Sequence, residues 1–68
     1  MFYKQDFRDY SLYMKVNGQC KNGHYKTVVF DTIRSKTYRG TCSDLKIWTP
    51  CLGVDIPLKA VNKMNAIL

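Results

Sequence analysis

The sequence has no glutamate and only two alanines among its 68 residues, so strong helix formers are scarce. No apolar run approaches the roughly 18 residues of a membrane span, and the N-terminal segment lacks the apolar stretch of a signal peptide. A chain of this length buries only about 60% of the surface that it exposes when unfolded. We therefore expect one small domain over residues 1–68, with no membrane segment and no separate catalytic domain.

Cysteine is limited to three residues, an odd number in a chain without a recognisable export signal, which favours reduced thiols and a cytoplasmic location. Cys20, His24, Cys42 and Cys51 make a Cys₃His set, but their spacing departs from the C-x₂₋₄-C pairs of structural zinc sites. His24 is the only general base near neutral pH, and no Gly-rich phosphate loop or nucleophile elbow is present. We expect no metal, no cofactor, no catalytic residue and no enzymatic activity.

Valine, isoleucine, threonine, tyrosine and phenylalanine are frequent, which predicts a mostly β domain. From Tyr10 to Val16 apolar residues alternate with polar ones, as in a strand with one buried face. A second strand-like run covers residues 24–33. Between these runs lie Asn17-Gly18 and Asn22-Gly23, each typical of a type I′ hairpin turn.

The register of this hairpin depends on which turn forms its tip. With Asn22-Gly23 at the tip and regular pairing, Met14 would face Asp31, which would place a carboxylate among core residues. A bulge at Gly18, where glycine adopts positive φ, or a loop over residues 17–23 avoids this conflict. Both alternatives place the same four residues on the core side: Leu12, Met14, Val28 and Phe30.

The second half of the chain predicts shorter elements. A turn at Arg34-Ser35 precedes a strand over residues 36–42, and weaker strand patterns cover 45–48 and 52–56. A competing interpretation begins a helical turn at Ser43-Asp44, because both residues are favourable N-caps. At the C-terminus, Asp55 caps a helix with Pro57 in its first turn. Its apolar residues recur at helical spacing: Ala60, Val61, Met64, Ile67 and Leu68.

These patterns predict an α+β fold: a small twisted antiparallel β-sheet, or a partly open SH3-like barrel, of four or five strands with one C-terminal helix. A helix of about ten to twelve residues is marginal alone, so it must dock on the sheet. The predicted core consists of apolar residues from all these elements: Leu12, Met14, Val16, Val28, Phe30, Ile33, Leu45, Ile47, Trp48, Val54, Ile56, Val61, Met64 and Ile67.

Charge and aromatic residues concentrate in the first forty positions, which hold eight Lys and Arg against three Asp and eight of the nine aromatic residues. Lys and Arg neutralise phosphates, and exposed rings stack on bases, so this combination predicts a surface for DNA or RNA. The candidate phosphate contacts are Lys15, Lys26, Arg34, Lys36 and Arg39. The candidate stacking residues are Tyr13, Tyr25 and Tyr38. The hairpin places Tyr13, Lys15 and Lys26 on the face opposite the core.

Tyr and Arg are also frequent anchors of protein interfaces, so the alternative partner is an acidic or nucleic-acid-associated protein. The general character of this short Lys-, Asn- and Tyr-rich chain resembles the small accessory proteins that bacteriophages express against host factors. This resemblance implies a regulator or inhibitor of a host or defence complex that acts by binding, and it assigns no site residue. Because the core is small and has no crosslink, the sequence also leaves open a homodimer through an exposed strand or the helix.

Overall fold

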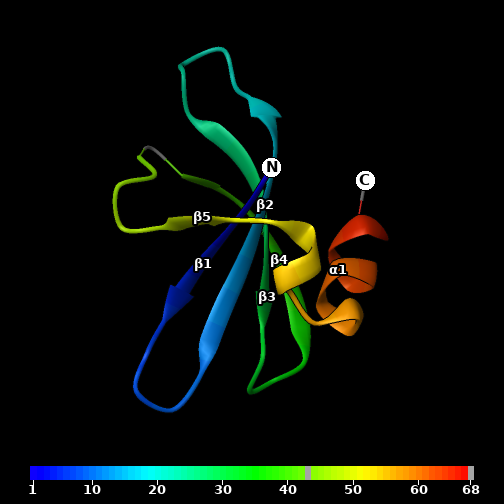
Figure 1. Ribbon diagram of the computed structural model, residues 1–68. Coiled ribbons are helices and arrows are strands. Elements are labelled where there is room, and N and C mark those ends of the chain that lie inside the picture. The colour runs from blue at the N-terminus through cyan, green and yellow to red at the C-terminus, as the bar shows by residue number, and fades with distance from the viewer. Residues whose placement is uncertain (43, 68) are drawn as a thin grey trace.

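The computed structural model describes residues 1–42 and 44–67, which form one antiparallel sheet with a helix packed on one face (Figure 1). The strands are β1 (Phe2–Asp6), β2 (Ser11–Gln19), β3 (Tyr25–Asp31), β4 (Lys36–Cys42) and β5 (Thr49–Cys51). The sheet order is β4-β3-β2-β1-β5, so β4 and β5 lie at its two edges and the sheet is not closed. A 3₁₀ turn, η1 (Gly53–Asp55), leads to the helix α1 (Leu58–Asn65). The predicted α+β fold is confirmed.

The β2–β3 hairpin contains the predicted bulge, between Val16 and Gly18, and Gly18 has a φ of +148°. The predicted register is nevertheless wrong. Cys20 N–H donates to His24 O at 2.6 Å, so three residues form the tip instead of two. This difference shifts the pairing by one residue. Met14 therefore pairs with Val29, and Tyr13 pairs with Phe30.

A one-residue shift reverses the faces of a strand, so Val28 and Phe30 lie on the face opposite Leu12 and Met14. Val28 and Phe30 form the main core with three residues that follow β5: Ile56, Ala60 and Met64. Ala60 and Met64, which lie on α1, are fully buried, at 0% exposure. Five partly buried residues pack around this core: Phe2, Tyr13, Cys51, Val61 and Ile67.

The other face of the sheet is also apolar at its centre. Met14 is only 1% exposed there and pairs with Tyr3 on one side and Val29 on the other. Leu12 and Val16, on the same face, are half-buried. The chain therefore buries apolar side chains on both faces of the sheet, and only one of these faces carries the helix.

Several local predictions are wrong after β4. Residues 45–48 form a turn, with Trp48 N–H donating to Leu45 O at 3.1 Å, and the next strand is β5. β5 contains Pro50, which an edge strand tolerates because the backbone N–H that proline lacks is not needed on the unpaired side of the strand. Three predicted core residues are exposed: Ile33, Ile47 and Val54.

The ends of the chain differ from prediction in two ways. Phe2–Asp6 forms β1 between β2 and β5, although no strand was predicted there. The helix is shorter than predicted and starts after Pro57, without a side-chain cap from Asp55. Two predictions, an N-cap at Ser43 and an apolar contact by Leu68, fall outside the described residues.

Candidate nucleic-acid interface

Most of the excess positive charge lies on one part of the fold. The segment from β3 through β4 and the helix α1 carry six Lys and Arg residues against one acidic residue, Asp31, whereas the rest of the chain carries five Lys and Arg against four Asp. All six cations are exposed. Because α1 packs against β3 and β4 pairs with β3, these elements are neighbours (Figure 1). The six cations, here called the basic surface, are Lys26, Arg34, Lys36, Arg39, Lys59 and Lys63.

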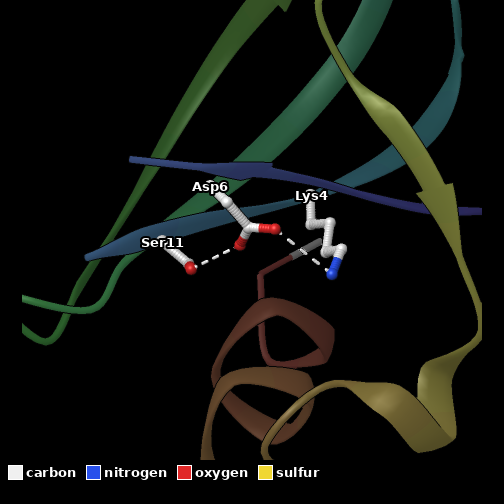
Figure 2. Close-up of polar contacts among 3 residues, drawn as sticks. All are labelled: Lys4, Asp6 and Ser11. Atoms are coloured by element: carbon white, nitrogen blue, oxygen red, sulfur yellow. Dashed lines mark hydrogen bonds and ion pairs between the residues drawn. The ribbon is translucent and has the colours of Figure 1, made fainter. Parts of the chain in front are cut away.

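The basic surface has no carboxylate partner within 4.0 Å in the described part of the chain. The one ion pair found there joins Lys4 Nζ to Asp6 Oδ2 at 3.3 Å on β1, as Figure 2 shows. Ser11 Oγ donates to Asp6 Oδ1 at 2.7 Å, and this hydrogen bond, followed by the contact with Lys4, lowers the pKa of Asp6. The one acidic side chain of β1, Asp6, is thus paired locally, and the six cations remain available to an external anion.

Two candidate cations lie on the helix-bearing face of the sheet. Arg39 pairs with Val28, and Lys26 lies two residues before Val28 on the same strand, so both point to the face of the main core. Lys15 shares this face and pairs with Val28 from the other side. The prediction that Lys15 and Lys26 lie opposite the core is therefore wrong. The one-residue shift of register brings Lys15 to the face of Val28, and Lys26 shares this face because alternate residues of one strand point the same way.

Lys15 differs from the other candidate cations because it is half-buried and already engaged. Its Nζ donates to Asn65 Oδ1 on α1 at 2.7 Å. This contact joins β2 to the end of the helix, which gives Lys15 a structural role within the fold. Lys15 is therefore left out of the basic surface.

Arg34, Lys36 and Tyr38 lie along the β3–β4 turn and the edge strand β4. Tyr38 lies beside Arg34, and its hydroxyl raises the pKa of the guanidinium. Lys36 pairs with Asp31 across the ladder, but Asp31 Oδ1 accepts hydrogen bonds from the backbone N–H groups of Ile33 and Arg34. The carboxylate therefore shapes the turn, and it forms no ion pair with Lys36 in the described residues.

The three candidate tyrosines differ in exposure. Tyr38 is 44% exposed on the edge strand, whereas Tyr13 and Tyr25 are half-buried. Tyr13 packs against the main core, on the helix side of the sheet, so its predicted position opposite the core is also wrong. Tyr38 is the one candidate with a ring free enough to stack on a base.

Lys59 and Lys63 were not among the candidate cations from the sequence. Their spacing of four residues places them on one side of α1. Both reach the β3–β4 turn: Lys59 Nζ donates to Ser35 Oγ at 3.3 Å, and Lys63 Nζ donates to Ser35 O at 3.0 Å. The spacing of the two lysines is visible in the sequence, but only the docking of the helix shows that this side meets a turn of the sheet.

The cysteine and histidine residues do not assemble into a metal centre. Within residues 1–42 and 44–67, no group of three or more His, Cys, Asp or Glu side chains is close enough to hold a metal ion. All three cysteines are free thiols of intermediate exposure, and partial burial raises the pKa of Cys51. None of the described helices is long and apolar enough to cross a bilayer.

A shallow groove of about 500 Å³ lies at the other edge of the sheet, beside β5. Its lining is mixed, with apolar residues and one charge of each sign: Met1, Lys4, Pro50, Cys51, Leu52 and Asp55. Lys4, Cys51 and Asp55 are its titratable residues, but Lys4 already pairs with Asp6, and the side chains of the lining carry no excess of one charge. It therefore indicates no particular chemistry.

No family model, curated protein or solved structure matches this chain in the three comparisons. The interpretation of function therefore depends on the charge, exposure and contacts of its own residues.

Proposed function

We propose that this protein is a small, basic, non-enzymatic regulator that binds nucleic acid through the basic surface. The observation that supports this most strongly is the separation of charge: six exposed cations against one Asp, with no ion pair to them among residues 1–42 and 44–67. Cations that served only for solubility would be expected around the whole molecule. Nucleic acid is the partner whose repeated phosphates match a band of such charges.

A single strand fits the surface better than a duplex, because Tyr38 offers an exposed ring beside Arg34 and on the same face of β4 as Lys36. Stacking of a base on an aromatic ring contributes about 1–3 kcal/mol and is tolerant of sequence. Arg34, beside Tyr38, is placed to contact the phosphate next to a stacked base. The remaining surface cations supply contacts that depend on charge and not on base identity.

Fluorescence anisotropy with a random single-stranded DNA, the matching RNA and a duplex, each between 50 and 200 mM NaCl, tests this proposal. Four phosphate contacts on a single strand predict a salt slope of about −2.8 and an affinity loss of about fifty-fold over this range. Absence of binding to all three probes, or binding that does not change with salt, contradicts the proposal.

A matched pair of double variants tests whether the basic surface makes these contacts. Lys36→Gln with Arg39→Gln removes two charges from β4, and Lys21→Gln with Lys46→Gln removes two exposed charges outside the surface. We expect the first pair to weaken binding at least about tenfold and the second less than about threefold. Equal losses would show that net charge, and not this surface, determines affinity.

The second candidate is a regulator that binds an acidic or nucleic-acid-associated protein, such as a phage-type inhibitor of a host or defence complex. The observation that favours it is the free edge of β4, where Tyr38 and Arg39 are exposed beside unpaired backbone groups. Such an edge can accept a strand from a partner. This candidate predicts no salt-dependent oligonucleotide binding, and protection of β4 amides from hydrogen exchange when the partner purified from the native cell is added.

A further inference from the structure

Ser35 lies at the point where the helix meets the β3–β4 turn, and two ammonium groups converge on it. Lys59 Nζ is 3.3 Å from its Oγ, and Lys63 Nζ is 3.0 Å from its carbonyl oxygen. The backbone of Ser35 has a φ of +52°, in the left-handed region that residues other than glycine rarely adopt. In this conformation the hydroxyl of Ser35 accepts from Lys59 and its carbonyl accepts from Lys63.

The two lysines gain little for the helix itself. Like charges at positions i and i+4 repel each other on a helix surface. No carboxylate lies within 4.0 Å of either ammonium in the described part of the chain, and both are exposed. Their observed acceptors are neutral oxygens of one serine. A bound anion would supply the missing negative charge and reduce the repulsion between Lys59 and Lys63.

The space beside Ser35 and Lys63 is open and has the size of a small ligand. A groove of about 430 Å³ is lined by Ser35, Lys36, Thr37, Lys63, Ala66 and Ile67. Its lining contains two lysines, two hydroxyl-bearing residues and no acidic residue. Lys63 is held beside this groove, because its Nζ also lies 6.0 Å from the centre of the Phe30 ring.

We propose that Lys59, Lys63 and the Ser35 hydroxyl form a binding site for one phosphate group, with Lys36 at its border. A phosphate has several acceptor oxygens, so it can receive hydrogen bonds from both ammonium groups and from the hydroxyl at once. The proposal rests on the proposed function insofar as the occupant is a backbone phosphate of nucleic acid. The same chemistry also accommodates a free phosphate ion.

The test uses isotope-labelled full-length protein and two probes, inorganic phosphate and a single-stranded oligonucleotide, with chloride at equal ionic strength as the reference. We expect phosphate to shift the backbone amide signals of Ser35 and Lys36 in a saturable manner. The variant Lys59→Gln with Lys63→Gln should lose this response. Glutamine retains helix propensity close to that of lysine, and preserved dispersion of the spectrum confirms folding.

Two controls separate this site from a general effect of charge. Lys21→Gln with Lys46→Gln removes the same charge elsewhere, and Lys59→Arg with Lys63→Arg retains it at the site. Both should keep the phosphate response. With the oligonucleotide, the glutamine pair at the site should lower affinity at least about tenfold and reduce the salt slope by about 0.7, which corresponds to one phosphate contact.

The outcomes distinguish the site from the function. Oligonucleotide binding that is equally affected by the two glutamine pairs, with no response of Ser35 to phosphate, overturns the site and leaves the proposed function intact. Saturable phosphate binding at Ser35 without oligonucleotide binding supports the site with a free phosphate and overturns the proposed function. No response to either probe overturns both.

Discussion

Gly18 lies in the bulge that interrupts the pairing of β2 with β3, so its replacement is a direct test of this part of the fold. Its φ of +148° lies in a region that side chains with a Cβ rarely adopt, and no heavy atom lies within 4 Å of the position that a Cβ would occupy. The penalty for Gly18→Ala is therefore entirely conformational. A residue forced into such a region costs about 1–3 kcal/mol, and the reduced entropy of the unfolded chain offsets about 0.4–1 kcal/mol.

We expect Gly18→Ala to lower the free energy of unfolding by about 1–2 kcal/mol. At about 0.05–0.15 kcal/mol per residue, the whole chain has about 3–10 kcal/mol, so this loss is a large share. Urea unfolding followed by circular dichroism measures it. With a slope of about 1 kcal/mol per molar urea, the midpoint should fall by about 1–2 M.

Gly40 provides the matched control on β4. Its φ is not positive, and an added Cβ would meet only Thr27 Oγ1, at 4.0 Å. Gly40→Ala should therefore change the free energy of unfolding by less than about 0.5 kcal/mol. Equal stability of Gly18→Ala and Gly40→Ala would refute the conclusion that the bulge requires a glycine at position 18.

Two further predictions concern the helix and the ion pair on β1. Met64→Ala should cost about 2–5 kcal/mol in urea unfolding, because Met64 is fully buried against the sheet. Leu58→Ala, at a position that is 73% exposed on the same helix, should change the stability by less than about 0.5 kcal/mol, and similar losses would contradict docking through Met64. Because the pKa of Asp6 is lowered in the folded state, its contribution to stability is present above its unfolded pKa of about 3.9 and is lost as the pH falls through the lower folded value. The melting temperature of wild type should therefore exceed that of Asp6→Asn near neutral pH and converge with it in strong acid, and a difference that does not change with pH would contradict this role.

Local patterns predicted the elements better than the way in which they combine. Alternation and β-branched residues indicated β2, β3 and β4, and Asn17-Gly18 indicated the bulge. The register depended on whether two or three residues form the hairpin tip, a choice that the pattern Lys21-Asn22-Gly23 leaves open. β1 was missed because its side chains alternate weakly between apolar and polar, and its place between β2 and β5 results from tertiary pairing.

The candidate interface shows the same limit. Arg34, Lys36 and Arg39 are exposed on the turn and strand where the sequence predicted them, because the β3–β4 hairpin is local. Lys15 and Tyr13 lie on the face opposite to the predicted one because the register differs, and Lys15 Nζ donates a hydrogen bond to Asn65 on the helix. These outcomes depend on contacts between segments far apart in the sequence. A pattern within one segment does not contain that information.

The position of α1 connects the core to the basic surface. Ala60 and Met64 are fully buried against the sheet, and each follows directly after a lysine, Lys59 and Lys63. Successive helical residues are separated by about 100°. Burial of Ala60 and Met64 therefore brings Lys59 and Lys63 to the border of the contact, where oxygens of Ser35 accept hydrogen bonds from both ammonium groups. The same docking that stabilises the fold therefore adds two cations to the four on β3, β4 and their turn. Cations that are far apart in the sequence become neighbours around β3 and β4 only when the helix is in place.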